Sequence, residues 1–216
     1  YHEITKSIII LVYGHRCAAG KQQMSKQLLV FSCRFILVDS MRNVEIKAKI
    51  TDYENICKVA EDLSGGPPTI INQDDTFYKV NEGRLKMRIY ADSSATLVRY
   101  DRADEDGPKL SNYELLDFSV NECVKAKLLD EMLKKCLGIR GRVVKERKLF
   151  MVDQTRIHID TVEDLGNFME LEVVLRAEQT LEEGQAIARD LQTKLGVKDE
   201  DLIDCAYVDL LDKKNN

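Results

Sequence analysis

The chain has 216 residues, of which 44% are apolar and 32% are charged, and its net charge is −5. This length and composition predict one domain of ordinary size or two small ones, and they exclude a disordered tail. The acidic charge disfavours a nucleic-acid-binding module. The apolar runs at 7–13 and 28–38 are too short, or too interrupted, for a membrane span of about 20 residues.

The charge is divided unevenly along the chain. Residues 1–40 carry a net charge of +3, whereas the remainder carries −8. The first methionine is Met24, and Met41 directly precedes the first clear strand pattern. We therefore predict that residues 1–40 are an N-terminal extension, disordered or artefactual, that residues 41–212 form the main domain, and that residues 213–216 are a short tail.

The main domain begins with a strand, a helix and three more strands. Residues 42–50 alternate apolar and polar side chains, which predicts a half-buried strand. Asp52 stands where it would cap a helix over 53–63, and the run Gly65–Pro68 ends that helix. Three further strands are predicted at 70–80, 83–90 and 95–102.

After a loop at 104–108 the same order occurs again. We predict a strand at 111–120, a helix at 123–137, three strands at 142–150, 155–162 and 167–175, and a final helix at 181–194. The duplicated unit gives about eight strands with too few helices for a doubly wound parallel sheet. The predicted fold is therefore α+β, an eight-stranded antiparallel β-barrel closed on itself to form a tunnel, with flanking helices.

Long charged side chains occupy the polar face of most of these strands. The basic positions are Lys86, Arg88, Arg102, Lys145 and Arg147, and the acidic ones are Asp160, Glu170 and Glu172. An open sheet with its charged face in water would show the same alternation, so that fold stays an alternative. Inside a water-filled tunnel, a basic wall would bind a polyanion, and an acidic wall would bind a hard cation such as Mg²⁺ or Mn²⁺.

The six cysteines are widely spaced and form no CxxC or CxxH pair. This spacing is not that of a zinc site or of a small disulfide-rich domain. It favours a reducing compartment, and we predict a cytoplasmic protein.

A series of short motifs runs from Met41 to about Leu211. It consists of Asn43–Lys47 (NVEIK) and the segments 83–88, 97–102, 145–147, 158–160, 165–172 and 207–211. In this order the motifs resemble those of the CYTH family of triphosphate tunnel metalloenzymes, whose opening strand carries ExExK. The resemblance implies a charged tunnel inside an eight-stranded barrel, a triphosphate substrate, and Mg²⁺ or Mn²⁺ as cofactor.

The resemblance also implies roles for individual residues. The implied triphosphate-binding set is Lys47, Lys86, Arg88, Arg102, Lys145 and Arg147, and the implied metal-binding set is Glu45, Asp160, Glu170 and Glu172. Glu45, Lys47, Lys145 and Arg147 are the predicted catalytic residues. His158 is either a contact to phosphate or substrate or a hydrogen-bonded histidine of the lumen, and Tyr207 is expected to be structural. Asn43 replaces the first Glu of the motif and cannot supply its charge.

The predicted function is metal-dependent hydrolysis of inorganic triphosphate, thiamine triphosphate or a nucleoside triphosphate. Two alternatives stay open: a class IV-like adenylyl cyclase that makes cyclic AMP from ATP, and a non-catalytic triphosphate or nucleotide binder, which Asn43 favours. The expected partner is a small molecule, without nucleic acid or membrane, and the sequence does not distinguish a monomer from a homodimer.

Overall fold

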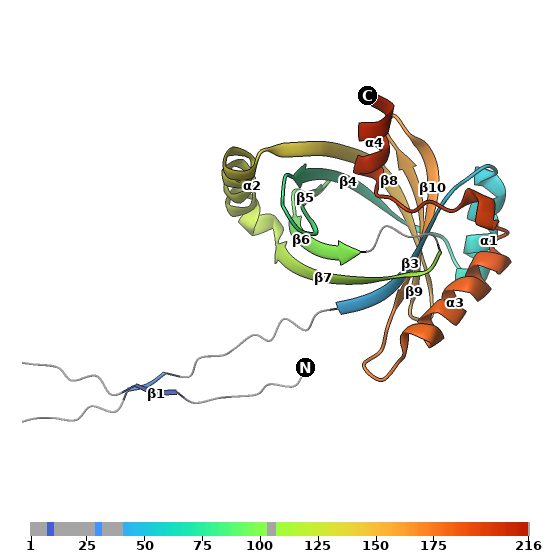
Figure 1. Ribbon diagram of the computed structural model, residues 1–216, viewed down its shortest axis with the longest axis horizontal. Helices are drawn as coiled ribbons and strands as arrows, with labels where there is room; N and C mark the ends of the chain where they lie inside the picture. The colour runs from blue at the N-terminus through green and yellow to red at the C-terminus, as the bar shows by residue number, and fades with distance from the viewer. Residues whose placement is uncertain (1–7, 11–28, 32–40, 103–106, 216) are drawn as a thin grey trace, which may run out of the picture. The chain divides into compact units, whose positions relative to one another are not determined.

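The computed structural model describes residues 8–10, 29–31, 41–102 and 107–215 (Figure 1). The chain divides into two compact units, 1–39 and 40–216. In the first unit the short strands β1 (Ile8–Ile10) and β2 (Leu29–Phe31) pair antiparallel. The rest of the predicted extension lies outside the described residues, and its role stays a prediction.

The second unit is a closed barrel of eight antiparallel strands, as the sequence predicts. The strands are β3 (Met41–Lys49), β4 (Thr69–Tyr78), β5 (Arg84–Tyr90), β6 (Ala95–Arg102), β7 (Lys109–Phe118), β8 (Ile139–Val152), β9 (Thr155–Val162) and β10 (Gly166–Val174). They follow one another around the barrel in the order β10-β3-β7-β6-β5-β4-β8-β9. The helices are α1 (Tyr53–Ser64), α2 (Cys123–Leu137), α3 (Leu181–Lys194) and α4 (Tyr207–Asn215).

The predicted duplication is visible in the strand order. The first unit of the duplication is β3-α1-β4-β5-β6 and the second is β7-α2-β8-β9-β10. When each strand is exchanged with its counterpart, β3 with β7, β4 with β8, β5 with β9 and β6 with β10, every neighbouring pair of the ring is reproduced. The two halves therefore join through equivalent contacts, β3 to β7 and β4 to β8, and each of the eight barrel strands has a neighbour on both sides.

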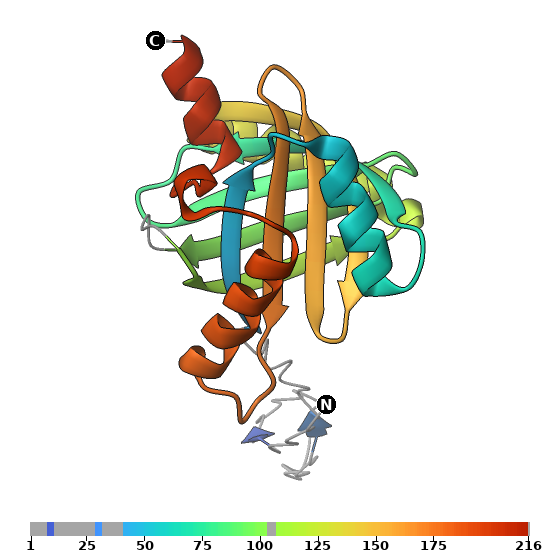
Figure 2. The ribbon, with the colours of Figure 1, turned by 90° about the vertical axis from the view of Figure 1, so that its right-hand side faces the viewer.

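Helices α1 and α3 cover the outer face of β3, β8, β9 and β10 (Figure 2). The alternation of β3 explains this packing, because Val44, Ile46 and Ala48 point outward and are fully buried beneath the helices. Asp52 caps α1 as predicted, since its Oδ1 accepts a hydrogen bond from the Asn55 backbone N–H at 3.1 Å. The polar side chains of the same strands consequently point into the barrel.

Helix α2 lies on the other side of the barrel from α1 and α3 (Figure 1) and packs against Tyr78 and Met87. The Tyr78 hydroxyl donates a 2.6 Å hydrogen bond to Asp130 Oδ1 of α2. Gly138, with φ at +78°, turns the chain from α2 directly into β8. Strand β8 therefore starts at Ile139 rather than at the predicted Arg142.

The predicted final helix, α3, is not the last one. A fourth helix, α4, begins at Tyr207 and runs to Asn215, into the predicted tail. Its first turn packs against lumen-facing apolar side chains at one end of the barrel, among them Phe77, Val143 and Phe168, so α4 covers that end. The segment is short and its apolar stripe is weak, so the sequence pattern does not predict this helix. Among the described residues, no helix has the length and apolarity needed to cross a membrane.

Candidate active site inside the barrel

The barrel encloses a cavity of about 310 Å³ lined by charged side chains from seven of its strands. These side chains reach the cavity because every second residue of a strand points to the same face, here the inner one. The charged residues that line the cavity are Glu45, Lys47, Asp75, Lys86, Arg88, Asp117, Lys145, Arg147, Arg156, Glu170 and Glu172. The open sheet with a solvated charged face is thus excluded, and the charges face inward.

A first ion-pair cluster joins β4 to β5. Asp75 lies opposite Arg88 in the strand register and accepts two hydrogen bonds from it, Nε to Oδ1 at 2.7 Å and Nη2 to Oδ2 at 2.8 Å. Lys86 Nζ adds a third, to Oδ2 at 2.8 Å. Burial alone would raise the pKa of Asp75, but the Arg88 and Lys86 cations outweigh it and hold that pKa far below its ordinary value. Asp75 is therefore a carboxylate that pairs with both cations of β5.

A second cluster joins β8, β9 and β10. Arg147 lies opposite Asp160 and binds it through Nε at 2.7 Å and Nη2 at 2.7 Å, while Nη2 also reaches Glu170 Oε2 at 2.8 Å. Asp160 Oδ2 accepts further bonds from Lys145 Nζ and from the Tyr207 hydroxyl, both at 3.0 Å. Asp160 is fully buried, and Arg147 and Lys145 keep its pKa well below the ordinary value against the effect of burial.

Two lysines of these clusters have altered proton affinity. Burial, reinforced by the neighbouring Arg147 cation, lowers the pKa of Lys145 to about 7. Burial and the Arg88 cation lower the pKa of Lys86 to about 8. In both residues these effects exceed the opposite pull of the aspartate partner. Each lysine would bind a proton more tightly if an anion entered the cavity beside it.

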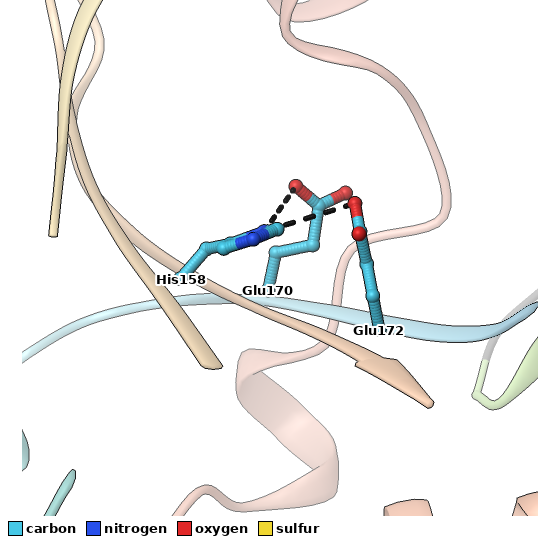
Figure 3. A group of neighbouring side chains, drawn as sticks. All are labelled: His158, Glu170 and Glu172. Atoms are coloured by element: carbon cyan, nitrogen blue, oxygen red, sulfur yellow. Dashed lines mark ion pairs between the residues drawn. The ribbon is translucent and has the colours of Figure 1, made fainter. Parts of the chain in front are cut away.

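A third group contains His158 on β9 and Glu170 and Glu172 on β10 (Figure 3). Glu170 lies opposite His158 on one side and opposite Lys47 on the other, and Lys47 Nζ donates to Glu170 Oε1 at 2.9 Å. The imidazole Nδ1 lies 3.8 Å from Glu170 Oε2 and 3.7 Å from Glu172 Oε1. One ligand atom from each of the three residues lies within 4.8 Å of the others.

Comparison with protein-family models places a match to the CYTH domain over residues 41–207. The chain belongs to the CYTH domain family. The match spans the whole ring of strands and ends at the first residue of α4. It agrees with the resemblance that the sequence motifs indicate.

Solved structures share the fold at low sequence identity. The PH1012 protein of Pyrococcus horikoshii OT3 is 24% identical, with a TM-score of 0.65 over 78% of this chain and 98% of its own. A conserved hypothetical protein from Pyrococcus furiosus is 22% identical, with a TM-score of 0.63 over 78% and 99%. A protein from Vibrio parahaemolyticus named as a candidate adenylate cyclase is 15% identical, with a TM-score of 0.62 over 81% and 99%. Comparison with curated proteins finds no significant match.

The third group fits the divalent cation that the CYTH family uses. Its donors are carboxylate oxygens and one imidazole nitrogen, and both kinds coordinate divalent metals. His158 Nδ1 and Asn43 Oδ1 are buried side-chain atoms without a hydrogen-bond partner among the described residues. A buried polar atom without a partner is costly, so these atoms favour a ligand in the lumen. Glu170 and Glu172 would hold such a cation, with His158 as their neighbour.

The predicted site residues of this CYTH protein are not all brought to one place. Lys47, Lys86, Arg88, Lys145 and Arg147 line the cavity as expected, together with Glu45, His158, Glu170 and Glu172. Glu45 lies opposite Glu172 in the register but outside the three-residue group. Asp160 also lies outside that group, engaged by cations and by Tyr207. Arg102 belongs to β6 by its backbone, and its side chain lies outside the described residues.

Three charged residues of the lumen are absent from the predicted site, namely Asp75, Asp117 and Arg156. Asp75 follows another aspartate, so the alternation of β4 alone does not say which of the two points inward. Arg156, whose Nη1 lies 3.3 Å from Glu172 Oε2, alternates with Ile157 and could have been found by that signal. Because Asp75 lies between the cations of β5 and β8, the basic and acidic walls are less separate than the sequence suggests.

Proposed function

We propose that this CYTH protein is a metal-dependent triphosphatase, acting on inorganic triphosphate, thiamine triphosphate or a nucleoside triphosphate. The observation that carries the proposal is the lumen itself. Lys86 and Arg88 face the cavity from β5, and Lys145 and Arg147 face it from β8, on the other side of β4, with carboxylates beside them. A cavity of about 310 Å³ is small for a whole nucleotide but suits a chain of phosphates, since ligand pockets begin at roughly 300 Å³.

Exchange of ion-pair partners would let the substrate in. In the structure, Asp75 pairs with Lys86 and Arg88, and Asp160 pairs with Lys145 and Arg147. Phosphate oxygens offer these cations the same geometry that the carboxylates do, and the guanidinium groups can bind them with two parallel hydrogen bonds. The cations would thus hold the triphosphate in place and neutralise the charge that develops on it as a phosphoryl group leaves.

The acidic side of the lumen would hold Mg²⁺ or Mn²⁺, through Glu170 and Glu172 with Glu45 across the register. When bound, such a cation supplies Lewis-acid polarisation of the phosphate oxygens and a defined position for water. Lys47 and Arg147 keep Glu170 in a fixed position through hydrogen bonds of 2.9 and 2.8 Å. The protein's contribution would be positioning and charge neutralisation, without a covalent intermediate.

Product analysis tests this proposal. The protein is incubated with inorganic triphosphate, thiamine triphosphate and ATP, each with Mg²⁺ or Mn²⁺, and the products are identified. Release of inorganic phosphate supports hydrolysis, whereas cyclic AMP with pyrophosphate identifies a cyclase. Tight binding of triphosphate without a product under either metal identifies a binding protein.

Variants test the residues. Lys145→Ala, Arg147→Ala and Glu170→Gln are each expected to reduce turnover at least about 100-fold, because each removes a contact to the reacting phosphates or to the metal. Arg142→Ala is the matched control. Arg142 lies on the same strand and binds Asp74 with the same two-point geometry, at 2.7 and 2.6 Å, but it lies on the outer surface. Full metal-dependent activity in all three lumen variants would refute the proposal.

A further inference from the structure

The inference concerns His158 and rests on the proposed function, since it names the metal for the same acidic group. His158 is 3% exposed, and its Nδ1 has no hydrogen-bond partner among the described residues. That nitrogen points toward the Glu170 and Glu172 carboxylates, as Figure 3 shows. At 3.7 and 3.8 Å, both oxygens are too far for a hydrogen bond, yet the distances suit a cation held between the three residues.

The surroundings of the imidazole leave Nδ1 as its available atom. On its other side, Nε2 lies 3.5 Å from Arg147 Nη1, at the outer limit of a hydrogen bond. Arg147 Nη1 is itself a donor, so coordination through Nδ1 requires this contact to be given up while Nε2 carries the ring proton. Glu170 is meanwhile fixed by Lys47 and Arg147, and Glu172 by Arg156. Two oxygens and one nitrogen are therefore positioned around one point before any metal binds.

An imidazole nitrogen distinguishes between divalent metals. Mg²⁺ takes oxygen ligands almost exclusively, whereas Mn²⁺, Co²⁺ and Zn²⁺ accept imidazole, with affinity rising from Mn²⁺ to Co²⁺. We infer that His158 Nδ1 coordinates the metal together with Glu170 and Glu172, so that this lumen selects a transition-metal dication over Mg²⁺. A site made of oxygens alone would have no such preference.

The first test uses the metal alone with the full chain. Because His2 and His15 are the other histidines of the sequence, the experiment uses a His2→Gln, His15→Gln background with His158 as its only imidazole. Mn²⁺ is added, and electron spin echo envelope modulation is recorded. We expect nitrogen modulation from one coordinated imidazole, which disappears when the protein is labelled with ¹⁵N-histidine and is replaced by the ¹⁵N pattern. Bound Mn²⁺ without nitrogen modulation would overturn the inference.

The second test measures affinities for Mg²⁺, Mn²⁺ and Co²⁺ by calorimetry. The variant His158→Asp replaces the nitrogen ligand with an oxygen at the same position. Loss of a residue that only supports a metal ligand weakens metal binding roughly 10- to 100-fold. Loss of the nitrogen ligand itself should weaken Co²⁺ binding by at least this factor, while Mg²⁺ binding stays the same or becomes tighter. Thr161→Val, an exposed position on the same strand, is the control and should change neither. Equal loss for both metals in His158→Asp, or a wild-type preference for Mg²⁺, would refute the inference.

The two proposals fail in different ways. Nitrogen-coordinated Mn²⁺ without hydrolysis of any triphosphate would refute the triphosphatase and leave the metal assignment standing. Hydrolysis with Mg²⁺ as the preferred metal and no nitrogen signal would do the reverse. Neither result depends on whether His158→Asp folds, because the spectroscopic test uses the unaltered lumen.

Discussion

The two duplicated units share their strand topology but differ in what their inner faces carry. In the first unit, Asp75 serves both Lys86 and Arg88, so the cations of β5 have a single carboxylate between them. In the second, Arg147 alone contacts two carboxylates, and Glu172 and His158 lie beside them. The comparison teaches that the same ring pairing supports either pattern, and that among the described residues the three-residue donor group for a metal lies in the second unit.

The largest expected effect comes from breaking the second cluster. Arg147→Ala should lower the free energy of unfolding by about 3–5 kcal/mol, because it leaves Asp160 and Glu170 buried with fewer partners. Arg142→Ala removes an ion pair of the same geometry at the surface, 64% exposed on the arginine side, and should cost about 0–1 kcal/mol. Denaturant unfolding of both variants measures the difference, and equal losses would contradict the assigned burial of the cluster.

The first cluster is tested by Asp75→Asn. The amide keeps the shape of the side chain but leaves Lys86 and Arg88 without a countercharge, which should cost about 2–3 kcal/mol. An entering polyanion would restore that charge. Inorganic triphosphate should therefore raise the thermal midpoint of Asp75→Asn more than that of the wild type. A smaller rise in the variant would mean that these two cations do not face the anion.

The pH dependence of anion binding follows from Lys145, whose pKa of about 7 lies below its ordinary 10.5. Between these values the ligand-free lysine is neutral, and a bound phosphate would protonate it, so binding takes up a proton. Affinity for triphosphate should accordingly fall as pH rises from 7, by up to about tenfold per pH unit for each proton taken up. Calorimetry at pH 8.5 in buffers of different ionisation enthalpy measures the uptake, which should shrink in Lys145→Met.

The same lowered pKa has a consequence for the free protein. Unfolding returns Lys145 to its ordinary pKa, so the unfolded chain binds more protons between pH 7 and 10.5. The lysine's contribution to stability is fully present above this window and is lost as pH falls through it. The free energy of unfolding of the wild type, relative to that of Lys145→Met, should therefore be smaller at pH 7 than at pH 9. Denaturant unfolding of both proteins at the two pH values measures this difference.

The smallest effect is expected for Tyr207→Phe. The ring, which lies under Lys47 Nζ at 4.1 Å, stays in place, and only the hydroxyl's hydrogen bond to Asp160 is lost. Unfolding should become easier by about 1 kcal/mol, and turnover should change by only a few-fold. Activity assays and denaturant unfolding check both. A loss as large as that of Arg147→Ala would give Tyr207 a part in the chemistry rather than in the structure.

Much of the fold could be predicted from the sequence because it depends on local patterns. Strand alternation determines which face of β3 is apolar. Single residues mark the ends of a helix, as Asp52 and Gly65 do for α1. The repeated order of elements indicates the duplication, and eight strands without crossover helices imply antiparallel pairing. Helix α4 could not be found in this way, because its place is fixed by the lumen-facing residues it packs on.

The sequence by itself determined the barrel and most of the charges that face its lumen, since an inner face follows from a period of two. Only the tertiary structure decided which charges meet. The register places Glu170 between Lys47 and His158, and Arg147 opposite Asp160. These partners come from different strands, and the sequence does not say which residues of two strands lie opposite each other. The attraction between two charges weakens over a few ångströms, so the role of each carboxylate depends on which side chains the register brings next to it. Asp160 is bound by Lys145 and Arg147, whereas Glu172 lies beside His158 at the cavity.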